Sequence, residues 1–249
     1  MKNNLLTKDA NTQKIFAKTA LNELRMSDHS LGRSLALCLV FESAKNQLLA
    51  ASIFNLAIAL DAALHIPSES MLAAIRIQWW ADALAKTTNQ NVPLVACLQS
   101  HYQININFLP QLQEMIGEWQ VACHDEPRES SAGWAAAWRL VAIYLGHGTA
   151  AKQAAIIGRG LHSATRGQKY TDIICNTDIK SFRYNDQKEV RSWLYLTACL
   201  HRKLQRCPDC DLESARILHH PRHDDPLLVW RILRWHFFGP PRRNNPCSK

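Results

Sequence analysis

The longest apolar stretch of the chain, LLAASIFNLAIALDAAL at residues 48–64, constrains the fold most. It is long enough to cross a bilayer as a helix, but it contains Asn55 and Asp61. A charged side chain is costly inside a membrane, whereas a helix that is apolar on every side can lie in a protein core. We therefore expect a buried core helix here rather than a membrane span.

The composition favours helices along the whole chain. The 249 residues include only nine glycines and are rich in alanine and leucine, and the 47% of hydrophobic residues suffices for a large core. Apolar residues recur at helical spacing, and no convincing strand pair is found. The sequence therefore predicts a single all-α domain. The expected helices span about 11–24, 30–43, 46–65, 70–86, 92–101, 108–123, 132–146, 150–164, 187–206 and 226–238.

Charge is unevenly distributed between the two halves of the chain. Residues 1–125 carry a net charge of −1, and residues 126–249 carry +9. A basic half indicates either an anionic partner, such as a diphosphate, a phospholipid surface or nucleic acid, or a solvated basic face. The eight cysteines are scattered, several in apolar helical patterns, and the first residues have no apolar core, so we expect no secretory signal. These features predict free thiols in a reducing, cytoplasmic compartment.

The segment IRIQWWADALAK, residues 75–86, places two tryptophans on a helix. Its spacing puts Ile75 and Trp79 on one face, which predicts core packing for Trp79. Arg76 and Trp80 lie together on an adjacent face, where Trp80 could line a cavity or stack on the guanidinium. A guanidinium on so apolar a helix needs a partner, and Asp61 is the first candidate. In that case Asp61 is an ion-pair partner rather than a metal ligand.

The order of these two segments resembles the squalene/phytoene synthase family. The resemblance is closest to the branch of the mitochondrial complex I assembly factor and its bacterial relatives. It implies an isoprenoid-synthase-like helical bundle around a central cavity over residues 30–239, preceded by an N-terminal extension and first helix at 1–29 and followed by a disordered tail at 240–249. The matching residues are Phe54, Asn55, Arg76, Gln78, Trp79 and Trp80, with HSATRGQKY at 162–170 and PLLVWRILRWHFFG at 226–239.

The resemblance also implies which residues line the cavity or bind a ligand. They come from the two matching segments near residue 60 and from the segment that begins at residue 162. The expected residues are Asn55, Asp61, Arg76, Gln78, Trp80, His162, Arg166 and Tyr170.

Prenyl coupling in this family uses magnesium ions held by two acidic motifs on facing helices, because Mg²⁺ takes oxygen ligands together with substrate phosphates. Here the first motif would fall at 57–63, where Asp61 is the single acid, and the second at 154–166, where there is none. We therefore expect no catalytic residue and no cofactor. The expected role is assistance in respiratory-complex assembly or binding of an apolar isoprenoid or lipid. The alternatives are a Mg²⁺-dependent prenyl transferase and a basic module that binds anionic surfaces.

Two further patterns lie in the C-terminal half. Residues 226–243 contain a basic helix with aromatic residues, which predicts either peripheral membrane contact or docking on the bundle. Nucleic acid is not an expected partner. A protein of this kind would be cytoplasmic and peripheral to the inner membrane, or mitochondrial if the source is eukaryotic. A weaker pattern predicts either a zinc site or a solvent-facing turn, and its residues are Cys207, Cys210, His219 and His223.

Overall fold

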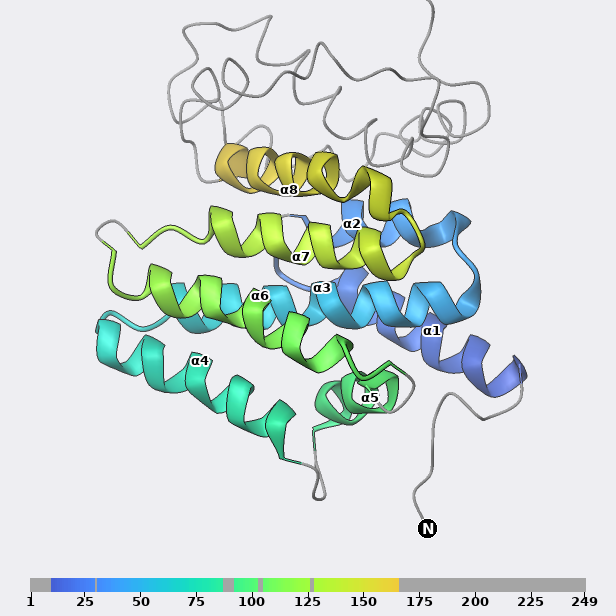
Figure 1. Ribbon diagram of the computed structural model, residues 1–249, viewed down its shortest axis with the longest axis horizontal. Coiled ribbons are helices and arrows are strands. Elements are labelled where there is room, and N and C mark those ends of the chain that lie inside the picture. The colour runs from blue at the N-terminus through green and yellow to red at the C-terminus, as the bar shows by residue number, and fades with distance from the viewer. Residues whose placement is uncertain (1–9, 30, 87–91, 103–104, 126–127, 166–249) are drawn as a thin grey trace, which may run out of the picture.

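The computed structural model describes residues 10–29, 31–86, 92–102, 105–125 and 128–165, and within these ranges every regular element is a helix (Figure 1). The all-α prediction is therefore confirmed for the described residues. The domain limit at 239 and the helices expected at 187–206 and 226–238 lie outside them. The elements are α1 (Ala10–Met26), α2 (Gly32–Cys38), η2 (Leu39–Phe41), α3 (Ala44–His65), α4 (Ser70–Ala85), α5 (Pro93–Tyr102), α6 (Phe108–Ala122), α7 (Ser131–Tyr144), η3 (Gly148–Ala150) and α8 (Ala151–Thr165).

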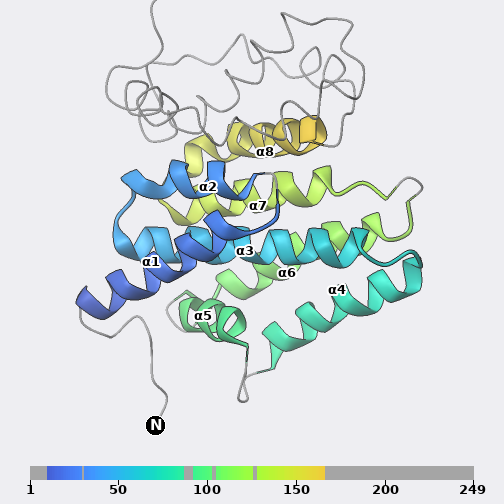
Figure 2. The same ribbon diagram turned by 180° about the vertical axis from the view of Figure 1, so that it is seen from behind.

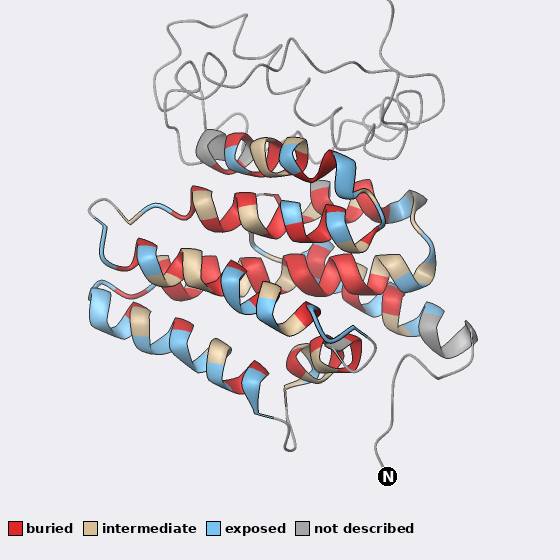
Figure 3. Cartoon of the chain, viewed as in Figure 1, coloured by how far each residue is buried: buried red, intermediate tan, exposed pale blue. Residues whose placement is uncertain are grey.

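Helix α3 forms the centre of the bundle. It contacts α1, α2, α4, α5, α6 and α7, and residues on all its faces are buried, as the red ribbon in Figure 3 shows. It is also the one helix of the described residues that is long and apolar enough to cross a membrane, yet 72% of its most apolar window is buried inside the fold. Burial on all sides is the environment that an apolar helix without a polar face requires.

Both ends of α3 are held by side-chain hydrogen bonds. Ser43 caps the first turn, where its hydroxyl accepts from the backbone N–H of Asn46 at 3.3 Å. At the other end, Arg128 donates to the carbonyl oxygens of Leu64 at 3.1 Å and Pro67 at 3.0 Å. The bond to Leu64 satisfies a carbonyl of the last turn of the helix, and both bonds fix the segment before α7 against the end of α3.

Helices α7 and α8 lie side by side in both ribbon views (Figures 1 and 2), and a glycine allows their close approach. A Cβ at Gly158 would lie 2.4 Å from Cδ1 of Trp138 and 2.7 Å from the carbonyl oxygen of Trp134, both on α7. No side chain larger than a hydrogen fits between the helices at this point. The last turn of α8 is thereby placed over the end of α3.

Helix α4 lies at the edge of the bundle, and the expected core packing of Trp79 is wrong. Leu72, Ile75 and Trp79 do share a face, but that face is exposed, and Trp79 is 49% accessible rather than part of the core. Ile77, fully buried, faces inward instead. The reason is that α4 is apolar on several sides, so its spacing alone does not show which side meets α3.

The start of α4 is not capped by a side chain. The N-cap residue is Glu69, and its side chain makes no capping hydrogen bond. The carbonyl of Ser68 instead accepts a hydrogen bond from Arg128 at 3.1 Å. The turn is therefore stabilised from the α6–α7 segment rather than by a local serine.

Candidate functional site

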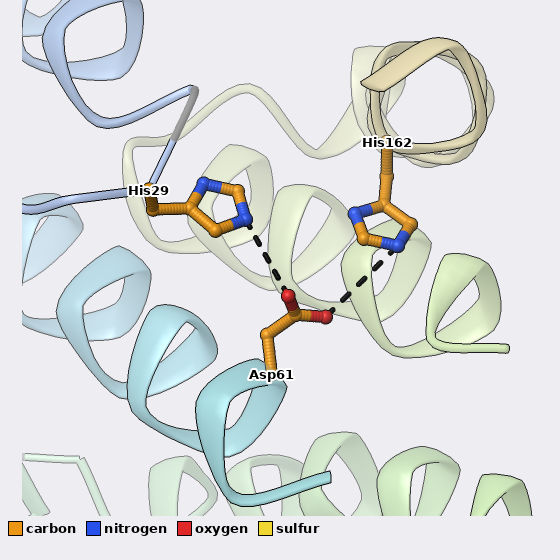
Figure 4. A group of neighbouring side chains, drawn as sticks. All are labelled: His29, Asp61 and His162. Atoms are coloured by element: carbon orange, nitrogen blue, oxygen red, sulfur yellow. Dashed lines mark ion pairs between the residues drawn. The ribbon is translucent and has the colours of Figure 1, made fainter. Parts of the chain in front are cut away.

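Asp61 is the centre of a buried polar cluster near the end of α3. The residue is 4% exposed, and three imidazoles surround its carboxylate. The Nε2 atom of His29 lies 3.5 Å from Oδ2, while Nε2 of His65 and of His162 lie 3.6 and 3.9 Å from Oδ1. Figure 4 shows His29 and His162 pointing at the carboxylate from two sides.

The three histidines reach Asp61 from separate parts of the chain. His65 follows it by one turn of α3, so the two side chains share a face. His162 comes from the last turn of α8. His29 lies in the turn between α1 and α2, where its Nδ1 accepts a hydrogen bond from the backbone N–H of Leu31 at 3.2 Å. A neutral His29 therefore carries its proton on Nε2, which faces Asp61.

Helix α7 completes the cluster with a hydroxyl and an indole. Ser130, at the start of α7, donates its hydroxyl to Oδ1 of Asp61, and its Oγ lies 2.8 Å from Nε2 of His162 and 3.2 Å from Nε2 of His65. Trp134, one turn further, donates Nε1–H to the same Oδ1 at 3.3 Å. The carboxylate thus has partners from α3, from α7, from α8 and from the α1–α2 turn.

These contacts decide the charge state of Asp61. Burial raises the pKa of this carboxyl, but the hydrogen bond from His29, the positive charge of His162 and the hydrogen bond from Ser130 outweigh burial and hold the pKa well below its usual range. The group is therefore ionised at neutral pH. A buried anion is tolerated here because donors surround it.

The presence of Ser130, His162 and Asp61 together does not make a catalytic triad. In a triad the serine and the acid contact opposite nitrogens of the histidine. Here Ser130 and Asp61 both lie on the Nε2 side of His162, and the serine hydroxyl donates directly to the acid. Ser130 is also fully buried.

The same cluster contains a set of residues with the composition of a metal site. His29, Asp61 and His162 each offer one ligand atom, and the three atoms lie within 4.8 Å of one another. Two imidazole nitrogens and one carboxylate oxygen suit transition metals better than they suit Mg²⁺.

Asp61 and His162 were both predicted as site residues, and the structure brings them together. Asn55, also a predicted site residue, donates its amide to the carbonyl of Ala20 at 3.2 Å and links α3 to α1. Gln78 is exposed on α4, where it donates to Asp82 and accepts from Gln120, each at 2.8 Å.

The expected ion pair between Asp61 and Arg76 is wrong. Arg76 is exposed on α4, while the carboxylate of Asp61 is buried against the histidines. An exposed guanidinium is satisfied by water and needs no internal partner, so the premise of the prediction fails. Trp80 is half-buried and packs edge-on against Trp79, with ring centroids 5.0 Å apart.

The remaining predicted site residues lie outside the described part of the chain. They are Arg166 and Tyr170, the zinc alternative Cys207, Cys210, His219 and His223, and the membrane-contact segment 226–243.

Four members of the cluster were not predicted. His65 could have been predicted, because its spacing from Asp61 places both side chains on one face of the helix. His29, Ser130 and Trp134 gave no such signal, because they lie on other elements and only the tertiary structure brings them to Asp61.

Comparisons of the chain with protein-family models, with curated proteins and with solved structures found no match. The class that the described residues define is an all-α protein with a buried carboxylate–imidazole cluster.

Proposed function

We propose that the chain is a squalene/phytoene synthase-like protein that does not transfer prenyl groups, and that it assists assembly of a respiratory complex or binds an apolar isoprenoid or lipid. The observation that supports this is the environment of Asp61. It is the one acid of the segment where the resemblance implies the first magnesium motif, and imidazoles and a serine hydroxyl surround its carboxylate.

Magnesium chemistry would need more than this site offers. Mg²⁺ is held by oxygen ligands in near-octahedral geometry, and a bound diphosphate adds strong negative charge. Helix α8 would supply the second magnesium motif, but it contains no acidic residue. The side chain of α8 that faces Asp61 is His162. This pairing of one carboxylate with an imidazole supports a scaffold role over ionisation of an allylic diphosphate.

Diphosphate release tests the catalytic alternative directly. The full-length protein is incubated with farnesyl or geranylgeranyl diphosphate and Mg²⁺, and liberated diphosphate is measured. We expect no release above a protein-free control. Release that disappears in the Asp61→Asn variant would establish the prenyl transferase instead.

The two non-catalytic roles separate in a second experiment. Deleting the gene in its source cells and resolving the respiratory complexes on native gels tests assembly, with the intact gene returned as a control. Solvent extraction of the purified protein followed by mass spectrometry tests for a bound isoprenoid or lipid. Intact complexes after deletion exclude the assembly role, and an empty extract excludes the lipid role.

The proposed setting is the cytoplasm at the inner membrane, or the mitochondrion of a eukaryotic source, with residues 226–243 as the membrane contact. Sedimentation with anionic vesicles over a salt series tests that contact. Binding that weakens as salt rises is expected for a basic segment on an anionic surface. A single-stranded oligonucleotide tested in parallel should not bind.

A further inference from the structure

We propose that His29, Asp61 and His162 bind a divalent transition-metal ion, with zinc as the expected occupant. The three residues lie in the turn after α1, on α3 and on α8, and both imidazoles turn one nitrogen toward the carboxylate between them (Figure 4). The proposal stands on this geometry and does not depend on the function proposed above.

The separations of the donor atoms are close to those around a zinc ion. Zinc–nitrogen and zinc–oxygen bonds are about 2.0–2.2 Å long, so neighbouring ligands of a tetrahedral ion lie roughly 3.3–3.6 Å apart. Each imidazole lies near a different oxygen of Asp61: His29 Nε2 is 3.5 Å from Oδ2, and His162 Nε2 is 3.9 Å from Oδ1. All three donor atoms lie within 4.8 Å of one another. Shifts of about 1 Å in the side chains would bring them to the separations found around a zinc ion.

The donor types select the class of metal. Imidazole suits zinc, copper, iron and nickel, whereas magnesium and calcium prefer oxygen ligands throughout. Three protein ligands leave one tetrahedral position for water. Ser130, whose hydroxyl contacts both Asp61 and His162, is placed to hold that water.

The surroundings hold the ligands in position. Trp134 donates its indole N–H to Oδ1 of Asp61 at 3.3 Å. Its ring also stacks against His29 at 4.8 Å and against His162 at 5.6 Å between centroids. Partners of this kind orient metal ligands and contribute to affinity without touching the ion.

Several hydrogen bonds must change when the ion binds. Nε2 of His29 and Nε2 of His162 give up their protons and their bonds to Asp61 and Ser130 in exchange for the ion. Nδ1 of His29 accepts from the backbone N–H of Leu31, so a neutral ring carries its proton on Nε2. Zinc at Nε2 requires that proton to move to Nδ1, where it meets the Leu31 N–H. His29 therefore loses its hydrogen bond with Leu31 as well as the one to Asp61, and the turn shifts, without net release of a proton from His29.

Zinc titration of the full-length protein, produced without a histidine tag and stripped by a chelator, tests the proposal. We expect the His29→Ala variant to bind the ion about a hundredfold more weakly or worse, since loss of an outer-shell partner alone costs 10–100-fold. His29 is the better position to change because its side chain is 14% exposed, whereas that of His162 is 1% exposed and its loss endangers the fold. The matched control is His124→Ala, an exposed histidine after α6, which should bind like the wild type.

Two readouts place the ion in this cluster. The amide resonance of Leu31 should shift on zinc addition. A Cys207→Ser/Cys210→Ser variant should keep the ion that His29→Ala loses, and its cobalt spectrum should lack a thiolate-to-metal charge-transfer band. Absence of stoichiometric zinc binding, or binding that survives His29→Ala in a folded protein, overturns the proposal and leaves a hydrogen-bonded network without an ion. Loss of the ion in the cysteine variant overturns it as well.

Discussion

Buried titratable side chains in this protein differ in how they are satisfied. Asp61 keeps its charge because donors from three helices and a turn surround it. His101 on α5 is the opposite case: it is 6% exposed, and within the described residues its Nε2 has no hydrogen-bond partner. Burial, aided by the positive charge of Lys45, lowers the pKa of His101 to about 4.

The lowered pKa of His101 predicts acid sensitivity. An unfolded histidine titrates near pH 6.5, so between about pH 6.5 and 4 the unfolded state binds more protons than the folded state. The free energy of unfolding should therefore fall as pH drops through this window, by up to about 1.4 kcal/mol per pH unit from this residue. We expect His101→Phe to remove that part of the slope in urea unfolding curves measured from pH 7.5 to 4.5. An exposed counterpart, His124→Phe, should leave the slope unchanged.

At the scale of single helices, α4 presents one face to the core and another to solvent. Ile77 is fully buried, whereas Ile75, two residues earlier, is 58% exposed. Ile77→Ala should lower the free energy of unfolding by about 2–5 kcal/mol, because it leaves a cavity. Ile75→Ala should change it by less than about 0.5 kcal/mol. Equal losses in chemical unfolding would show that this register of α4 is incorrect.

Replacing either of two helical glycines with alanine should change the stability of the protein in opposite directions. At Gly158 a Cβ would meet Trp138 and the Trp134 carbonyl, so Gly158→Ala should force α8 away from α7 and cost about 1–3 kcal/mol. At Gly117, inside α6, nothing lies within 4 Å of the added Cβ, and Gly117→Ala should stabilise the protein by about 0.4–1 kcal/mol. Thermal unfolding of the two variants checks the contrast, which would fail if Gly158→Ala were neutral.

At the scale of the whole molecule, the Asp61 cluster connects distant parts of the fold. It joins the α1–α2 turn, the end of α3, the start of α7 and the last turn of α8. Each of these segments can meet Asp61 because Arg128 fixes the start of α7 and Gly158 lets α8 approach. The cluster therefore depends on the packing of the complete bundle.

Removing the shared carboxylate should destabilise the molecule globally. Asp61→Ala leaves the three imidazoles and Ser130 without their common partner inside the fold, and we expect a loss of about 3–5 kcal/mol in unfolding free energy. The comparison is Glu114→Ala, which breaks an exposed 2.7 Å pair with Arg139 and should cost less than about 1 kcal/mol. If guanidinium unfolding showed that Asp61→Ala costs as little stability as Glu114→Ala, the Asp61 cluster would not be holding these segments of the fold together.

The sequence by itself determined the helices and the burial of α3, because hydrophobic spacing, few glycines and a long apolar run are local properties. It also indicated Asp61 and His162, one as the lone acid of an apolar helix and both through a resemblance. It could not assign Arg76 and Trp79 to the correct side of α4, because a helix that is apolar on several sides does not encode which side is covered. Only the tertiary structure brought His29, Ser130 and Trp134 to the carboxylate. These residues are far from Asp61 in the sequence, and they become its neighbours only because the helices pack together.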